Sequence, residues 1–342
     1  MTTGIVKDRR YLDHNMGAGH IESPDRIEAI YDMIEKGLPF SPELIEPRLA
    51  SREEIEYVHA HEYVGFISLT AGRPYTLLDP DTSTTAKSYE TALLAAGGGL
   101  KAAEMIMDGK IKNGFALVRP PGHHAEHNRA MGFCIFNNVA IAAEHLLRDH
   151  GLKRILIADW DLHHGNGTQN SFYLRDDVLY FSTHQFPYYP GSGYWDEVGA
   201  GAGKGFTVNV PLTAGKTDQD YLFIYRNVLG PIAKAYKPEF ILVSAGFDIY
   251  GGDPLGGMEV TAPGFGALAA ELTAMAKEHC QGRILFLLEG GYSLEGLAEG
   301  VKQVLVQISG TGKPSALKAD ISITTQKEIT PVFDLHRKYW PL

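Results

Sequence analysis

The residues best suited to chemistry lie in one stretch, ILIADWDLHHGNGTQ, which runs from Ile155 to Gln169. An apolar run typical of a buried parallel strand leads into Asp159, Asp161 and His163. Residues two apart in an extended segment point to the same side, so we expect Asp161 and His163 to face one cation beside Asp159. Carboxylate oxygen and imidazole nitrogen suit Zn²⁺ or another borderline divalent metal. A solvated aspartate and a helix-capping aspartate would explain this pattern equally well if it stood alone.

Two adjacent histidines follow a second apolar run. The segment Phe115 to Val118 leads into RPPGHHA, which contains His123 and His124. Each imidazole has two nitrogens that need partners, so burying both rings in an apolar core would be costly. Their position after a strand matches that of Asp161 and His163, which favours a functional pair of histidines over a solvated loop.

A third acid stands at the end of another apolar run. Phe240 to Ala245 is followed by Gly-Phe-Asp, which places Asp248 just beyond the carboxyl end of that strand. Two carboxylates and one histidine balance the charge of a divalent cation and leave room for water, as catalytic zinc requires. Asp161, His163 and Asp248 are therefore a candidate metal-binding set.

A fourth run, Ile284 to Leu288, ends in Glu-Gly-Gly and Tyr292. The double glycine lets the backbone approach closely and turn sharply, and the phenol offers a hydrogen-bond donor. A buried structural tyrosine is the usual explanation when such a residue stands alone. Together, however, a metal, a histidine pair and a phenol are the parts needed to hydrolyse an amide: a base for the attacking water, an acid for the leaving amine, and donors for the oxyanion.

The order of these runs predicts the elements that bring the residues together. Strands alternate with helical patterns, which implies an α/β fold with a central, mostly parallel sheet and helices on both faces, in three layers. We find no linker or repeat and expect one domain over residues 1–342. Ligands in such sheets bind beyond the carboxyl ends of the strands. The expected strands are 115–118, 155–158, 178–182, 240–245 and 284–288, and the expected helices are 137–150, 218–236 and 262–279.

The first hundred residues are expected to be mainly helical. A helix capped by Ser23 should end at Gly37, another should span 51–69, and residues 73–85 are expected to form a loop. We interpret His59 and His61 as surface histidines. A further Ala-rich helix over 88–108 contains three consecutive glycines, which suggests close packing against a neighbouring element.

Composition excludes some classes of function. The formal net charge is -10, which argues against nonspecific nucleic-acid binding and suits a cationic substrate better. Two cysteines are too few for a disulfide framework, the first ten residues lack an apolar export segment, and no apolar run approaches a membrane span. We therefore expect a cytoplasmic protein. The sequence leaves the oligomeric state open, a homo-oligomer included, and does not say whether 311–342 covers the core or a partner.

With these residues in place, the chain resembles the zinc-dependent histone deacetylase family, in its class II branch, and bacterial amidohydrolases of the arginase/deacetylase superfamily. The matching segments are RPPGHHAEHNRAMGFCIFNN, ILIADWDLHHGNGTQ, LVSAGFDIYGGDPLGG and LLEGGY, with weaker agreement in GHIESPDRI. The order and spacing of four segments make this resemblance specific. It implies the arginase/deacetylase fold and removal of acetyl groups from amines.

The resemblance also implies a role for each matching residue. Asp161, His163 and Asp248 would bind one Zn²⁺ per chain; His124 would be the general base and acid, with His123 as its companion bonded to Asp159; Tyr292 would polarise the acetyl carbonyl. Asn166 stands where class I members carry an aspartate, so His124 should be less basic here.

Substrate and structural ions follow from the same resemblance. Phe133 and Tyr189 would wall a tunnel for the lysine stem, with Gly132 beside them and Leu255 at the mouth, where polyamine-specific relatives carry a glutamate. An apolar Leu255 favours acetyl-lysine over acetylpolyamines. Structural K⁺ is expected at two sites, bound mostly by main-chain oxygens. One would use Asp159, Asp161 and His163 main-chain oxygens with Ser182 and Thr183, and the other Phe172, Arg175, Val178 and Phe206.

Three alternatives remain open at this point. A deacetylase of small acetylated amines such as acetylpolyamines would use the same machinery. An arginase-like ureohydrolase with two manganese ions would need additional bridging acids and would leave the histidine pair and Tyr292 without a use. A binding module without turnover would be expected to have lost a metal ligand or the tyrosine, and this chain keeps all of them.

Overall fold

The structure is a computed structural model that describes residues 2–17, 19–313 and 321–342. Its centre is an eight-stranded sheet in the order β2-β1-β5-β10-β9-β6-β7-β8, and every strand pair described in it is parallel. The strands are β1 (Thr3–Val6), β2 (Glu43–Ile45), β5 (Asn113–Ala116), β6 (Ile155–Asp159), β7 (Val178–Gln185), β8 (Thr207–Leu212), β9 (Phe240–Ala245) and β10 (Ile284–Leu288). The predicted parallel sheet is confirmed.

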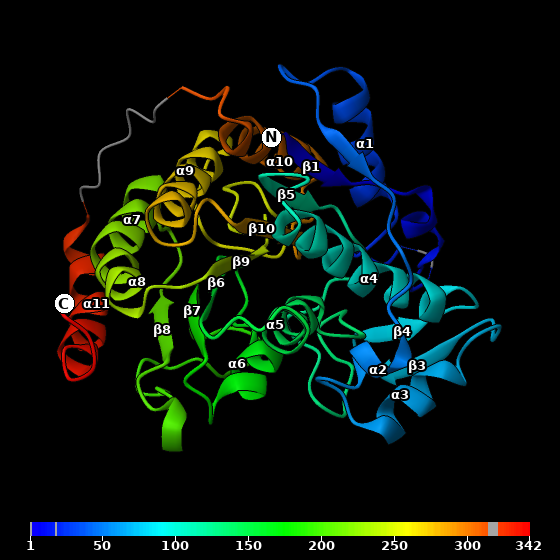
Figure 1. The fold of residues 1–342 in the computed structure, drawn as a ribbon, viewed down its shortest axis with the longest axis horizontal. Helices are drawn as coiled ribbons and strands as arrows, with labels where there is room; N and C mark the ends of the chain where they lie inside the picture. Colours follow the sequence, from blue (N-terminus) through cyan, green and yellow to red (C-terminus); the bar gives the residue numbers. More distant parts are fainter. Residues whose placement is uncertain (1, 18, 314–320) are drawn as a thin grey trace.

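The alternation of side chains along each strand divides the apolar interior into two cores. In β6, Leu156 and Ala158 belong to one buried cluster, whereas Ile155 and Ile157 belong to the other. Both faces of the sheet are therefore covered, as buried parallel strands require. One face carries α1 (Asp25–Glu35), α7 (Asp218–Ile224), α8 (Gly230–Tyr236), α9 (Ala262–His279), α10 (Leu294–Ser309) and α11 (Ile323–His336); the other carries α2 (Arg52–Ile55), α3 (His61–Ser68), α4 (Ser88–Met107), α5 (Asn138–Arg148) and α6 (Asn166–Phe172) (Figure 1).

The glycine triplet of α4 packs as closely as the sequence suggests. A Cβ atom on Gly97 would lie 1.9 Å from the Arg48 carbonyl oxygen, and one on Gly98 would lie 2.5 Å from the Tyr11 hydroxyl. Neither distance is compatible with a side chain. The triplet therefore lets α4 lie directly against the chain next to β2 and against the first segment.

Several expected elements differ from the structure. The helix expected over 51–69 is two helices, α2 and α3, and the loop expected over 73–85 contains a hairpin of β3 (Thr76–Asp79) and β4 (Thr82–Thr84). The helix expected over 218–236 is interrupted by a π-helical turn, η3 (Tyr225–Leu229). Ser23 does not cap α1, because Pro24 occupies the N-cap position. Two short 3₁₀ helices, η1 (Arg9–Asp13) and η2 (Gly201–Gly203), complete the described elements.

The sequence prediction omitted β1, β2 and β8 and the helices α6, α10 and α11. β1 and β2 have only four and three residues, too short for a pattern of alternating polarity to stand out. α11 packs against β8, and Trp340 Nε1 donates to the Gly205 carbonyl oxygen at 2.7 Å. The described part of the segment 311–342 therefore covers the core of this chain, and residues 314–320 of it lie outside the described ranges.

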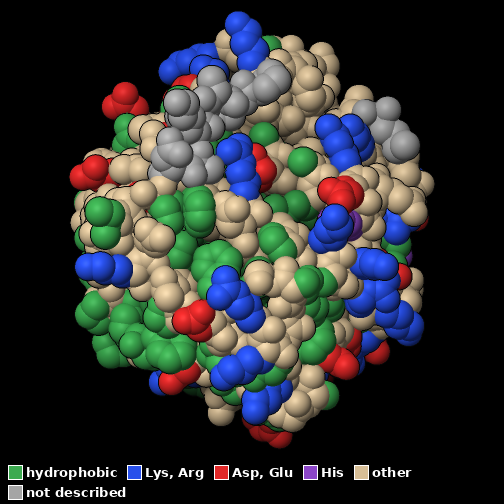
Figure 2. Space-filling model, turned by 90° about the vertical axis from the view of Figure 1, so that its left-hand side faces the viewer, with side chains coloured by type: hydrophobic (Ala, Val, Ile, Leu, Met, Phe, Trp, Pro, Cys, Tyr) green, Lys and Arg blue, Asp and Glu red, His purple; other side chains and the backbone are tan. Residues whose placement is uncertain are grey.

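On the side of the molecule where α8 and α11 lie, basic and acidic side chains are interspersed among apolar and uncharged ones (Figure 2). Among the described residues, no helix combines the length and apolar character needed to cross a membrane. The cytoplasmic location and the absence of nucleic-acid binding stay predictions.

Candidate active site

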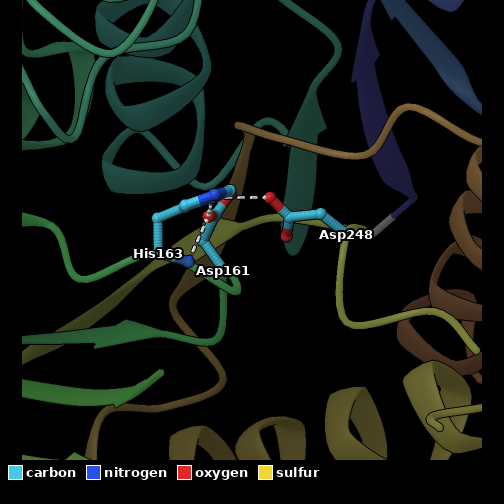
Figure 3. A group of neighbouring side chains, drawn as sticks. All are labelled: Asp161, His163 and Asp248. Carbon is cyan, nitrogen blue, oxygen red and sulfur yellow. Dashed lines mark hydrogen bonds and ion pairs between the residues drawn. The ribbon is translucent and has the colours of Figure 1, made fainter. Parts of the chain in front are cut away.

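The three candidate metal ligands converge beyond the carboxyl ends of two adjacent strands, β6 and β9. One potential ligand atom from each of Asp161, His163 and Asp248 lies within 4.8 Å of the other two. His163 Nδ1 lies 3.2 Å from Asp161 Oδ1 and 3.1 Å from Asp248 Oδ2, so the imidazole faces both carboxylates (Figure 3). β6 ends at Asp159, and residues 161–163 form a bend. The expected convergence is confirmed, but it arises from this bend rather than from an extended strand.

Backbone N–H groups orient both carboxylates, and Asp161 Oδ1 also accepts from the His163 N–H at 2.9 Å. Asp161 Oδ2 accepts from the Gly290 N–H at 2.8 Å, and Asp248 Oδ1 accepts from the Leu162 N–H at 2.8 Å. The remaining oxygens, Asp161 Oδ1 and Asp248 Oδ2, are the two that face His163. The carboxylates are thereby oriented before any ligand arrives.

Two glycines make this crowding possible. A Cβ atom on Gly246 would lie 2.1 Å from Asp161 Oδ2, and one on Gly290 would lie 2.3 Å from Asp248 Oδ2 and 2.6 Å from Asp161 Oδ2. The close approach expected of the Gly-Gly pair is confirmed for Gly290.

The charges of this cluster fit a bound cation. Burial and the neighbouring Asp161 charge raise the pKa of Asp248 to about 7, because two carboxylates so close together resist joint ionisation. Burial lowers the pKa of His163, but hydrogen bonds to Asp161 and Asp248 outweigh it and raise that pKa to about 9. Two buried carboxylates that resist joint ionisation, together with one imidazole, form a donor set that suits Zn²⁺.

His123 lies between two carboxylates. Its Nδ1 lies 3.0 Å from Asp159 Oδ2, which also accepts from the Tyr180 hydroxyl at 3.0 Å, and its Nε2 lies 3.7 Å from Asp161 Oδ1. Burial lowers the pKa of His123, but the charges of Asp161 and Asp159 outweigh burial and raise that pKa to about 10. The contact with Asp159 is the one that the resemblance implies.

His124, the next residue, has a neutral hydrogen-bond partner. Its Nδ1 lies 2.8 Å from Asn166 Oδ1, and its ring centroid is 4.0 Å from that of His123. Burial and the neighbouring His123 and His163 hold the pKa of His124 well below its usual range. Burial is the leading cause, and the hydrogen bond to Asn166 acts in the opposite direction, so the effect of having Asn166 in place of an aspartate stays a prediction. Gly132 packs against this ring, since a Cβ atom there would lie 2.3 Å from His124 Cδ2.

Glu289 supports the histidine pair, a role that was not predicted from the sequence. It is buried at the end of β10, and its Oε2 accepts from the N–H groups of Gly122 at 2.7 Å and His123 at 3.2 Å. Burial raises the pKa of Glu289 to about 7. Its position directly after a strand could have indicated this role, but only the glycines and Tyr292 of this segment were interpreted from the sequence.

Tyr292 is held by two residues that sequence reasoning also missed. Asp253 Oδ2 accepts from the N–H groups of Tyr292 at 2.6 Å and Ser293 at 3.0 Å. The Arg26 guanidinium lies 4.8 Å from the centroid of the Tyr292 ring and donates to the carbonyl oxygens of Glu289 and Gly291. Arg26 and Asp253 occur within GHIESPDRI and GGDPLGG, so both lie in segments that carry the resemblance.

These groups line one cavity of about 290 Å³. The sequence-predicted residues that line it are His123, His124, Gly132, Phe133, Asp161, His163, Tyr189, Leu255 and Tyr292. Asp159 and Asn166 lie behind the two histidines, and Asp248 lies beside His163. Asp81, Pro121 and Tyr188 complete the walls, together with Gly290. The structure thus brings every predicted catalytic, substrate-binding and zinc-binding residue to one place.

The interpretation of His59 as a surface histidine is wrong. His59 is 1% exposed; its Nε2 accepts from the Asn137 N–H at 2.9 Å, and its Nδ1 lies 2.8 Å from the Glu126 carbonyl oxygen. Burial lowers its pKa to about 4. His61 is exposed, as expected. His59 therefore connects the chain after α2 to the segment that follows the histidine pair.

Comparisons with known proteins agree with this geometry. The histone deacetylase domain family matches residues 20–308. A protein of Archaeoglobus fulgidus named probable deacetylase is 39% identical over 99% of both chains. Histone deacetylase 15 of Arabidopsis thaliana is 38% identical over 99% of this chain, which spans 63% of that protein. The crystal structure of the HDA15 HD domain matches with a TM-score of 0.92 at 38% identity, covering 99% of this chain and 95% of that one.

A chain with this fold, this site and these relatives belongs to the histone deacetylase family. It is an enzyme that hydrolyses the amide bonds of acetylated substrates. The predicted family and fold are confirmed, whereas the class II assignment stays a prediction.

Proposed function

We propose that this chain is a zinc-dependent deacetylase of N-acetyl-lysine-like substrates and that residues 1–342 form its single catalytic domain. The observation that carries the proposal is the convergence of Asp161 Oδ1, His163 Nδ1 and Asp248 Oδ2 beside His124 in the lined cavity. A divalent ion held there would polarise the acyl carbonyl and acidify a water molecule. An arginase-like pair of manganese ions would require a second such cluster, and the described residues provide only this one.

In this proposal the histidine pair moves the proton. His124 is the base, because its environment keeps the ring neutral and its Nδ1 is occupied by Asn166, which leaves Nε2 to accept a proton from the attacking water. The same nitrogen then returns a proton to the leaving amine. His123 stays protonated between Asp159 and Asp161 and contributes positive charge beside the reacting atoms.

Tyr292 stabilises the oxyanion. Burial holds the pKa of its hydroxyl well above the usual range, so the phenol keeps its proton and acts as a hydrogen-bond donor. Its ring lies edge to face with Phe133 at a centroid distance of 5.9 Å, which places it on the wall of the cavity. A fixed donor aimed at developing charge favours the transition state over the substrate.

The walls favour a slender aliphatic stem. Phe133 and Tyr189 line the cavity, and the Tyr189 ring meets the His124 ring at 5.2 Å and 85°. Leu255 adds an apolar side chain that offers no charge to a second amine of the substrate. Asp81 also lines the cavity, and its charge is the one observation that favours a small cationic substrate such as an acetylpolyamine.

The test is a substrate panel on protein reconstituted with one equivalent of Zn²⁺. We expect hydrolysis of an acetyl-lysine peptide to exceed that of N-acetylputrescine in kcat/KM. Asp248→Asn is the matched control, because it preserves the size of the side chain and removes one ligand charge; it should bind no metal tightly and have no activity. Metal content near one per chain in the wild type completes the expected result.

Two outcomes would contradict the proposal. A higher kcat/KM on N-acetylputrescine than on the peptide would identify an acetylpolyamine as the preferred substrate, while the proposed catalytic residues would remain the same. Full activity in Asp248→Asn would show that Asp161, His163 and Asp248 are not the metal ligands.

Structural K⁺ at the two sites named from the resemblance is proposed on the same basis. A thermal stability that is higher in K⁺ than in Na⁺ would support it.

A further inference from the structure

Asn166 has further partners that none of the proposed roles uses: two long contacts of Nδ2, each 3.4 Å, to the His124 carbonyl oxygen and Met131 Sδ, and a shorter one to Glu126. Its Nδ2 donates to Glu126 Oε1 at 2.5 Å. Asn170, one helical turn later on α6, also donates through Nδ2 to both oxygens of Glu126, at 2.9 and 3.1 Å. The amides of Asn166 and Asn170 therefore both donate to the Glu126 carboxylate, on the side of the Asn166 amide that faces away from the His124 ring.

This arrangement fixes the orientation of the Asn166 amide. Both oxygens of Glu126 accept from amide NH₂ groups, so the NH₂ group of Asn166 faces Glu126 and its Oδ1 faces His124 Nδ1. Since Oδ1 can only accept, His124 Nδ1 must carry a proton. In a neutral imidazole the lone pair is then on Nε2, the nitrogen that the proposed proton transfer requires.

Glu126 is itself held in place by its backbone. Its N–H donates to the Arg129 carbonyl oxygen at 2.9 Å, and its own carbonyl oxygen faces His59 Nδ1 at 2.8 Å. His59 Nε2 accepts from the Asn137 N–H, so the proton of this neutral, buried ring is on Nδ1 and is donated to Glu126. The contacts form a continuous series from His59 through Glu126 and Asn166 to His124.

We propose that Glu126 is a positioning residue of the active site, which holds the Asn166 amide in one orientation and thereby keeps the proton of His124 on Nδ1. The proposal rests on the proposed function in that it takes His124 as the base. Glu126 lines a separate hollow of about 270 Å³ with Glu144 and Arg148, and none of the residues lining that hollow lines the acyl cavity. A change at Glu126 should therefore alter proton transfer without altering substrate contacts.

The first test separates kcat from KM. Glu126→Ala should lower kcat by about 10-fold to 100-fold, the usual cost of removing a residue that orients a catalytic group, with little change in KM. Glu144→Gln is the matched control, because it neutralises another carboxylate of the same hollow that pairs with arginines and makes no contact with Asn166. It should change thermal stability but not kcat.

The second test exchanges donor and acceptor. Asn166→Asp should place two carboxylates against each other and lower kcat, because the new side chain offers Glu126 no hydrogen. Adding Glu126→Gln restores a complementary pair, in which the introduced Gln amide donates to the introduced carboxylate and that carboxylate accepts from His124. We expect the double variant to recover most of the kcat lost in Asn166→Asp, a coupling that independent sites would not show.

A third measurement does not depend on activity. In protein labelled with ¹⁵N-histidine, the His124 resonances, assigned through His124→Gln, should report a protonated Nδ1 in the wild type and a mixture of tautomers in Glu126→Ala. An unchanged tautomer and an unchanged kcat in Glu126→Ala would overturn the proposal, as would a double variant no better than Asn166→Asp. If the wild type hydrolysed no acetylated substrate, the proposed function would fail, while the tautomer would still decide the role of Glu126.

Discussion

The floor and the rim of the cavity are built in different ways. We define the floor as Asp161, His163, Asp248, Gly290 and Tyr292, and the rim as Phe133, Tyr189 and Leu255. On the floor, Asp161 and Asp248 are at most 1% exposed and accept backbone N–H groups from neighbouring strand ends. On the rim, Tyr189 is 37% exposed, and all three side chains come from loops.

Because of this difference, we expect the floor to determine the reaction and the rim to determine substrate preference. The floor residues follow closely on the carboxyl ends of β6, β9 and β10, which are adjacent and parallel, so the register of these strands brings those residues to one edge of the sheet. At that edge, the bend at 161–163 turns Asp161 and His163 toward Asp248. The rim depends on loop conformation: Phe133 has a φ of 69°, unusual for a residue with a side chain, and its N–H is held by Thr82 Oγ1 at 2.9 Å. Floor changes should therefore affect kcat and metal content, whereas rim changes should affect KM and substrate preference.

The largest effect is expected from Gly290→Ala. The added Cβ would lie 2.3 Å from Asp248 Oδ2 and 2.6 Å from Asp161 Oδ2, which must separate the two carboxylates. Losing the ion would remove several kcal/mol of transition-state stabilisation, so activity should fall by roughly 10³-fold or more, with metal content reduced in parallel. Gly65→Ala is the control, because its nearest neighbour is Arg52 Nη2 at 3.5 Å. A Gly290→Ala enzyme that retained metal and turnover would show that the floor is less rigid than its contacts indicate.

The next largest effect is expected from Tyr292→Phe. Removing the hydroxyl deletes one donor to the oxyanion and keeps the ring against Phe133 and Arg26, so kcat should fall by about 10²-fold to 10³-fold with metal content unchanged. Steady-state kinetics and metal analysis on the same preparation separate this outcome from that of Gly290→Ala. A change confined to KM would assign Tyr292 to the rim instead.

A smaller effect is expected from Asp253→Asn, because this residue links floor and rim. Its Oδ2 accepts from the N–H groups of Tyr292 and Ser293, while its Oδ1 accepts from the Leu255 N–H at 2.9 Å. An Asn amide can satisfy one side only, so either Tyr292 or Leu255 should lose its support. We expect kcat to fall by about tenfold. In a Tyr292→Phe background the loss in kcat should largely disappear, since the residue acts through the phenol; an additive loss would contradict that link.

The sequence was sufficient to predict the floor, because acids and histidines follow short apolar runs and parallel strands carry them to one edge. Arg26, Asp253 and Glu126 gave no such signal. Apart from Glu22, four residues earlier, the partners of Arg26 are backbone carbonyls more than 260 residues away, and a backbone atom leaves no mark in the sequence. His59 was misjudged for the same reason, since its burial depends on Asn137 and Glu126 in a distant segment. The sequence identifies the groups that react and some of their partners, such as Asp159 and Asn166, whereas the fold is needed to identify Arg26, Asp253 and Glu126.

The smallest effect is expected from Tyr189→Phe at the rim. The ring packs edge to face against His124 and partly faces solvent, so removing its hydroxyl leaves both the apolar wall and the floor contacts in place. We expect kcat/KM on an acetyl-lysine peptide to change by less than about threefold, as for surface substitutions away from buried networks. The ratio of rates on the peptide and on N-acetylputrescine is the sharper measurement, because it cancels any shared effect on the floor. If Tyr189→Phe lowered kcat on both substrates as much as Asp253→Asn does, the hydroxyl would belong to the catalytic machinery and the division between floor and rim would fail at this residue.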